Sequence, residues 1–192
     1  FTVFSNNNEY DDSDIEPIQG AFYASSSYTR MFFSKFREQR EEELKARMKA
    51  IDTEDEAFIL SDTNLIVIKG TPEYISSINE DSPTNRIITS LYTKDRILFL
   101  LKYGICYKMT TNKDGITQIE KHIMRYPQMF ATMAIRDKLR EGIRKGVIWH
   151  TQGSGKTALA YSNVKYLTDY FSKEEGKIAK FYFIVDRLDL AD

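Results

Sequence analysis

Residues 147–157 of this 192-residue chain read VIWHTQGSGKT. The apolar segment Gly146–Trp149 has the composition of a buried strand, and a helical pattern runs from Lys156 to Phe171. A second continuous apolar run, FYFIV, follows at 181–185. The order strand, helix, strand predicts an α/β fold with a parallel βαβ unit, whose strands are buried on both faces.

The turn between the predicted strand and helix has the residues of a phosphate-binding loop. Gly153, Ser154 and Gly155 are small, so successive backbone N–H groups can converge on an anion at a helix N-terminus. Lys156 supplies a cation for the β- and γ-phosphates, and Thr157 supplies a hydroxyl for Mg²⁺. We interpret these five residues as a nucleotide-phosphate site.

One position departs from the general pattern for such loops. The pattern places glycine three residues before Gly153, where this chain has His150. The alternative is a chance Gly-Ser-Gly-Lys turn. The flanking strand and helix, together with Thr157, favour the phosphate loop.

Composition limits the possible classes of protein. The chain is 42% hydrophobic and contains 12 Tyr, 12 Phe and one Trp, which is enough material for a folded core and excludes disorder. It has no apolar run near the ~20 residues that a membrane span requires. Net charge is −1, so a nucleic-acid surface would have to be a local patch. A single cysteine, Cys106, excludes an internal disulfide and fits a reducing compartment, the cytoplasm.

The first part of the chain is predicted to be a mixed α+β connecting region, residues 1–115, followed by an α/β domain at 116–192. The elements expected in the connecting region are a strand at 1–4, a helix at about 27–51, a hairpin at 57–68 and a helix at 96–107. Neither Phe1 nor Asp192 is typical of a natural terminus, so we interpret the chain as an internal piece of a larger protein.

Four stretches resemble one protein family. Residues 149–157 resemble helicase motif I of the R subunit of type I restriction-modification enzymes, where the histidine at position 150 is expected. Residues 125–128 (RYPQ) resemble that family's Arg-Tyr-His-Gln segment, with Pro127 in place of the histidine. Residues 185–190 resemble its motif Ia, and residues 3–7 resemble a Ser-Asn segment that leaves its nuclease domain.

The resemblance implies a fold and an activity. The R subunit is an ATP-driven translocase on double-stranded DNA, joined to a nuclease of the PD-(D/E)xK type. It works with methylation (M) and specificity (S) subunits and cleaves unmethylated foreign DNA. By this resemblance the C-terminal part of the chain is the start of a RecA-like helicase lobe, and its cofactors are ATP and Mg²⁺.

The resemblance also implies residue roles. Residues 153–157 would hold the ATP phosphates, with Thr157 on Mg²⁺. Gln128 would contact adenine, and this role is favoured over the alternative, a simple helix-surface amide. Arg187 would contact DNA, although an ion pair with Asp186 or Asp189 is equally compatible.

No complete catalytic set is present. The second acid needed for ATP hydrolysis and the arginines of a second lobe would follow residue 192, and the nuclease residues would precede residue 1. We therefore expect this piece alone neither to hydrolyse ATP nor to cut DNA. The alternatives are another superfamily 2 helicase, a small kinase, or a non-catalytic nucleotide-binding module, and the sequence downstream of residue 192 would separate them.

Overall fold

The computed structural model describes residues 2–6, 20–24, 33–48, 51–113 and 115–184. The chain divides into two compact units, residues 1–130 and 131–192. Among the described residues, no helix combines the length and apolar character needed to cross a bilayer.

A small antiparallel sheet lies at the centre of the first unit. Strand β2 (Gly20–Ala24) pairs with β1 (Thr2–Asn6) on one side and with β3 (Ser34–Phe36) on the other. The strand predicted at the start of the chain is therefore confirmed. Tyr23 of β2 is 1% exposed and packs edge-on against Phe36, with ring centroids 6.2 Å apart. Burial of each such ring contributes about 2–3 kcal/mol and fixes which face of the sheet is covered.

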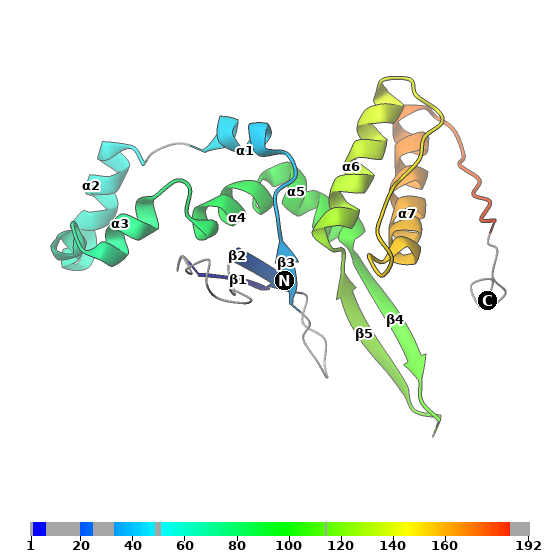
Figure 1. Cartoon of the computed structure of the whole chain (residues 1–192), viewed down its shortest axis with the longest axis horizontal. Coiled ribbons are helices and arrows are strands. Elements are labelled where there is room, and N and C mark those ends of the chain that lie inside the picture. Colours follow the sequence, from blue (N-terminus) through cyan, green and yellow to red (C-terminus); the bar gives the residue numbers. More distant parts are fainter. Residues whose placement is uncertain (1, 7–19, 25–32, 49–50, 114, 185–192) are drawn as a thin grey trace. The chain divides into compact units, whose positions relative to one another are not determined.

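Short helices follow the three-stranded sheet along the chain (Figure 1). They are α1 (Glu41–Arg47), α2 (Thr53–Ser61), the 3-10 helix η1 (Asp62–Ile68), α3 (Pro72–Ile78), α4 (Pro83–Leu91) and α5 (Lys94–Phe99), which continues into the π-helical turn η2 (Leu100–Gly104). Helix α4 packs on β1 and β2. It begins where it does because the Ser82 hydroxyl accepts a hydrogen bond from the Asn85 amide and proline occupies the first helical position.

A β-ribbon follows η2 and projects away from the helices of its own unit (Figure 1). It pairs β4 (Ile105–Thr111) with β5 (Thr117–Ile123) in antiparallel register. The predicted helix over 96–107 is correct only as far as Gly104. At that residue a side chain would press on Leu100, 3.0 Å away, so glycine lets the chain turn tightly into the strand. Cys106, expected on an apolar helix, lies half-buried on β4.

Two predicted elements of the connecting region are wrong. The expected helix over 27–51 is helical only at Glu41–Arg47, and Ser34–Phe36 is a strand. The reason is Glu38, whose carboxylate accepts hydrogen bonds from the amides of Gln39 and Arg40 and so holds a bend. Part of that range, 25–32 and 49–50, lies outside the described residues.

The predicted hairpin at 57–68 is a pair of helices, α2 and η1. The Asp52 carboxylate accepts a hydrogen bond from the Glu54 amide at 2.8 Å, and three acidic residues occupy the first turn of α2. Both features stabilise a helix N-terminus. They outweigh the β-propensity of the apolar residues that follow, which have no strand to pair with among the described residues.

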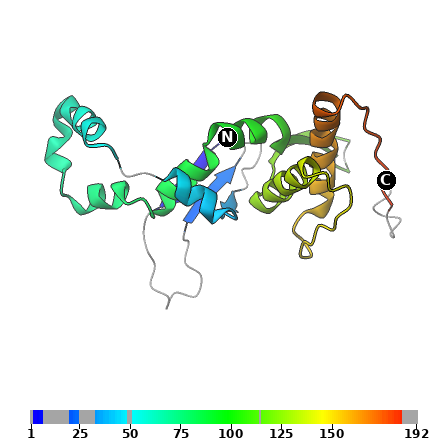
Figure 2. The same ribbon diagram turned by 90° about the horizontal axis from the view of Figure 1, so that it is seen from above.

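The second unit contains the C-terminal part of α6 (Tyr126–Arg140) and the 19-residue α7 (Lys156–Glu174), which lie side by side in Figures 1 and 2. The helix predicted from Lys156 is confirmed. The strands predicted at 146–149 and 181–185 are not formed among the described residues, and both described sheets are antiparallel. Val147 and Trp149 are 89% and 90% exposed. A parallel strand needs neighbours in the sheet and helices on its faces, and the described part of this unit supplies no such neighbours.

Candidate nucleotide-binding site

The segment between residue 150 and helix α7 forms a tight turn. The Ser154 amide donates to the Thr151 carbonyl at 3.3 Å, and the Ser154 hydroxyl donates to the same carbonyl at 2.7 Å. Gly153 and Gly155 have φ angles of +76° and +81°, in the left-handed region where a side chain is strained. The two glycines predicted to shape a phosphate loop therefore adopt conformations that favour glycine.

Helix α7 begins directly after Gly155, its N-cap residue. In an α-helix the first amides have no acceptor within the helix, so those of Lys156 and Thr157 face the N-terminal side, where an anion is favoured. Both side chains are exposed. The structure thus brings together the five residues predicted for the phosphate site, 153–157.

The Lys156 ammonium folds back over the turn instead of extending into solvent. Nζ donates to the carbonyl oxygens of His150 at 3.3 Å and Thr151 at 3.1 Å. Each carbonyl carries only a partial negative charge, so phosphate oxygens can replace them as partners. These two backbone acceptors were not identified from the sequence, because no residue type marks a carbonyl as a lysine partner.

The hydrogen bond from Lys156 to the His150 carbonyl shows how the unusual residue at position 150 takes part in the turn. His150 takes part through its backbone, and it precedes the positive-φ glycines, so the loop requires no glycine there. Its side chain is half-buried. The tight turn at 151–155 is formed with histidine at position 150.

Gln128 belongs to the first unit and is 4% exposed. Its Oε1 accepts a hydrogen bond from the Arg125 amide at 2.8 Å, so this side chain caps the start of α6. The burial of this side chain contradicts the alternative interpretation, a helix-surface amide. The adenine contact stays a prediction. Arg187 and the whole of 185–190 lie outside the described residues.

The basic residues around the end of α6 are paired with acids of the second unit. Arg140 contacts Glu174 at 3.0 Å, and Arg144 contacts Glu175 at 3.0 Å. A hydrogen bond from Lys177, and the nearby charge of Arg144, hold the pKa of Glu175 below its ordinary value. The described part of this helix end is therefore a solvated, charge-balanced face, as its alternating sequence suggests.

A groove of about 610 Å³ runs along α6 and reaches the loop at His150. Its walls are mostly apolar and include Ile135, Leu139, Val147 and Trp149. The predicted strand residues thus line an open apolar groove, which is a surface that a neighbouring strand would bury.

Comparison with known proteins gives three matches. Residues 127–192 match the SWI2/SNF2 ATPase family. The chain is 35% identical over 99 residues to a Methanocaldococcus jannaschii protein named as a candidate type I restriction enzyme MjaVIIP endonuclease subunit, covering 49% of this chain and 9% of that protein. It is 39% identical over 67 residues to the type I restriction enzyme SsaAORF53P endonuclease subunit of Staphylococcus saprophyticus, covering 35% of this chain and 7% of that protein.

No solved structure gives a significant match. The matched part spans less than a tenth of the length of either relative. Within that span, the chain is similar to type I restriction endonuclease subunits and its C-terminal part to SWI2/SNF2 ATPases, so the resemblance predicted from the motifs is confirmed.

Proposed function

We propose that this chain is part of the restriction subunit of a type I restriction-modification system. In the complete subunit, loop 150–157 would bind ATP with Mg²⁺ and drive translocation on double-stranded DNA. Methylation and specificity subunits would be its partners, and the cytoplasm its compartment. The supporting observation is the loop itself, with two left-handed glycines and a helix N-terminus under the Lys156 ammonium.

Different residues of the loop would contact different parts of the nucleotide. Backbone amides at 153–157 would bind phosphate oxygens, and the Lys156 ammonium would exchange its two carbonyl partners for the β- and γ-phosphates. The Thr157 hydroxyl, which is exposed, would bind Mg²⁺. Gln128 would contact adenine, and Arg187 would contact the DNA backbone. Mg²⁺ would neutralise phosphate charge during transfer.

We also propose that residues 146–149 and 181–185 become neighbouring parallel strands of a RecA-like lobe in the complete subunit. The support is the high exposure of their apolar side chains, which reaches 98% at Ile184, and the apolar groove beside α6. The domain boundary near residue 115 is part of the same proposal.

The test is nucleotide binding with a matched pair of lysine variants on α7. Lys156→Ala removes the loop cation, and Lys165→Ala removes an exposed cation from the same helix. Binding of a fluorescent ATP analogue in the presence of Mg²⁺ is expected to fall at least about tenfold in Lys156→Ala, because a charge-assisted contact of about 1.5–3 kcal/mol is lost. Lys165→Ala should bind as the unmodified protein does. Equal binding by both variants would contradict the phosphate-loop assignment.

The SWI2/SNF2 match supports a second candidate, a superfamily 2 ATPase without nuclease function. ATP-dependent cleavage of unmethylated DNA by the complete protein, assembled with its methylation and specificity subunits, separates the two. Cleavage supports the restriction subunit. DNA-stimulated ATP hydrolysis without cleavage supports the second candidate.

A further inference from the structure

Residues 52–81 of the first unit, here called the acidic arm, have a charge unlike the rest of the chain. The arm comprises α2, η1 and α3. It contains eight Asp and Glu residues against one lysine, a net charge of −7, whereas the whole chain has −1. The remaining residues therefore carry +6. A charge of this density sets up a local field that selects which surfaces can approach.

The arm also exposes an unusual number of large apolar side chains. Phe58 is 80% exposed and Val67 is 70% exposed. Three isoleucines on the same elements are more than half exposed: Ile59, Ile66 and Ile75. Single exposed apolar residues are ordinary, but a concentration of them on one short segment is typical of an interaction surface.

This exposure is not a sign of a loosely formed arm. Glu56 of α2 accepts a hydrogen bond from the Lys69 ammonium at 2.8 Å and another from the Tyr74 hydroxyl at 2.6 Å. These contacts tie α2 to the end of η1 and to α3. Leu60 is 2% exposed and forms the small interior. The elements of the arm are therefore joined to one another, while the five apolar side chains named above remain exposed.

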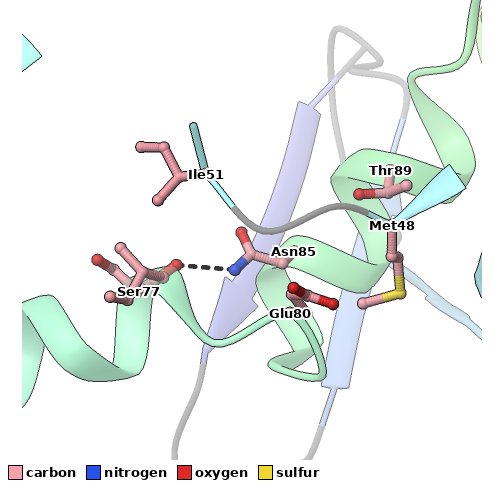
Figure 3. Close-up of a pocket in the computed structure, with 7 residues that line it drawn as sticks. Met48, Ile51, Ser77, Glu80, Asn85 and Thr89 are labelled. Carbon is pink, nitrogen blue, oxygen red and sulfur yellow. Dashed lines mark hydrogen bonds between the residues drawn. The ribbon is translucent and has the colours of Figure 1, made fainter. Parts of the chain in front are cut away.

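A pocket of about 220 Å³ lies at the base of the arm (Figure 3). Its lining is mixed, with Met48, Ile51 and Ile78 as apolar residues and polar residues that include Glu80. Glu80 has no hydrogen bond or ion pair with any other residue that the structure describes. Asn85 also lines the pocket, and its Nδ2 donates a hydrogen bond to the Ser77 carbonyl at 2.7 Å.

The size and lining of the pocket indicate what it accepts. Sites for small molecules usually occupy about 300–1,000 Å³, so this pocket is better matched to one side chain of a protein. Apolar lining residues beside a carboxylate that has no partner among the described residues fit a lysine or arginine, whose stem is apolar and whose head is cationic. The chemistry of the pocket and the charge of the arm therefore point to the same kind of partner.

The charge excludes two other classes of occupant. DNA and anionic membranes carry dense negative charge, and an arm of net charge −7 repels both. A permanent interior contact is also disfavoured, because the cores of obligate interfaces are depleted of charged residues. Apolar residues interspersed with acids are typical of an interface that a separate protein reaches with electrostatic steering.

We propose that the acidic arm docks an apolar protein segment of a partner subunit, with a lysine or arginine of that segment in the pocket beside Glu80. The choice of partner rests on the proposed function, in which this protein works with methylation and specificity subunits. The apolar residues Phe58 and Val67 would supply the contact area, and the acids would set orientation and association rate.

The test measures binding of the complete restriction subunit to the purified methylation–specificity complex of the same system. Phe58→Ser/Val67→Ser removes the apolar contact, and Glu80→Lys reverses the charge at the pocket. The controls are Tyr107→Ser, at a side chain 66% exposed on β4, and Asp95→Lys on α5. The two arm variants are expected to weaken binding about tenfold or more, while the controls bind normally. Circular dichroism and unfolding temperature would verify that each variant is folded.

Several outcomes would overturn the proposal. They are equal affinity for arm variants and controls, no binding by the unmodified subunit, loss of self-association in the arm variants, or a change in DNA affinity in place of subunit affinity. Lys156→Ala separates this proposal from the proposed function. That variant should assemble normally and lose nucleotide binding, whereas the arm variants should bind nucleotide and fail to assemble.

Discussion

A buried ion pair in the first unit gives a sharp prediction about stability. The side chains of Glu38 and Arg96 are each 2% exposed and contact one another. The Glu38 carboxylate also accepts from the hydroxyl of the buried Ser90 and from the amides of Gln39 and Arg40. A carboxylate with this many donors is fully satisfied inside the protein, so its removal leaves several polar groups unpaired.

The substitution Glu38→Gln tests how strongly the network depends on charge. The amide keeps one oxygen for the backbone donors, but it places an NH₂ group opposite the Arg96 guanidinium. Removing one partner of a buried pair costs about 3–5 kcal/mol. The lower end applies here, because the guanidinium also lies 5.2 Å from the centre of the Phe130 ring and 3.3 Å from Glu43. We therefore expect the free energy of unfolding to fall by about 3 kcal/mol.

The assay is urea unfolding of matched variants. Glu41→Gln is the control, because Glu41 forms an ion pair with Arg86 in which the side chains are 49% and 29% exposed. Its expected cost is about 0–1 kcal/mol. In a double-mutant cycle, Arg96→Met combined with Glu38→Gln should cost clearly less than the two single changes together. Additive costs, or equal costs for Glu38→Gln and Glu41→Gln, would refute the reasoning.

Three further predictions concern the loop, the sheet and the arm. Gly153→Ala should lower the free energy of unfolding by about 1 kcal/mol, because Gly153 has a positive φ and no other atom lies near the added methyl group. The control is Gly146→Ala, where φ is not positive and the space is equally open, and it should leave the free energy of unfolding unchanged in the same urea assay. Tyr23→Phe should cost about 1–2 kcal/mol, since the buried hydroxyl donates to a backbone carbonyl at 2.6 Å. Burial raises the pKa of Tyr23 far above its ordinary 10.0, so this stabilisation is complete below pH 10 and is lost as the pH rises above it, which unfolding at graded alkaline pH would follow. Hydrogen bonds from Lys69 and a tyrosine hydroxyl lower the pKa of Glu56 below its ordinary 4.5, so its stabilisation of the arm is present above pH 4.5 and is lost on acidification. The protection of α2 amides from exchange, taken relative to the intrinsic exchange rate at each pH, should fall on acidification and should not change with pH in Glu56→Gln.

The sequence predicted the features that depend on neighbouring residues. The loop at 153–157 and the start of α7 were both predicted, because glycine conformations and helix starts are set by a few adjacent positions. The turn at Gly104 and the helix α2 also have local causes, a close approach to Leu100 and a cap by Asp52. The apolar patterns at 96–107 and 57–68 predict a longer helix and a hairpin there, so these patterns alone are misleading.

Other features depend on contacts between distant positions. The bend at Glu38 is held by neighbouring amides, but the same carboxylate also pairs with Ser90 and Arg96, more than fifty residues away, and no local pattern predicts that pairing. The cap that Gln128 forms on the Arg125 amide is local, but the burial of Gln128 depends on tertiary packing, and glutamine is mostly exposed in proteins.

Among the described residues, the loop at 153–157 is formed although no strand lies beside it, and this has a physical explanation with a consequence for the proposed function. A phosphate loop is fixed by its own dihedral angles and by the helix that follows, whereas a parallel strand is stable only between neighbours. The glycines keep their left-handed conformations and Lys156 lies over the turn, although Val147 and Trp149 are almost fully exposed. The turn at 153–157 therefore forms without a neighbouring strand among the described residues. Nucleotide binding should depend on Lys156, while turnover should require the acids and arginines that a completed lobe contributes.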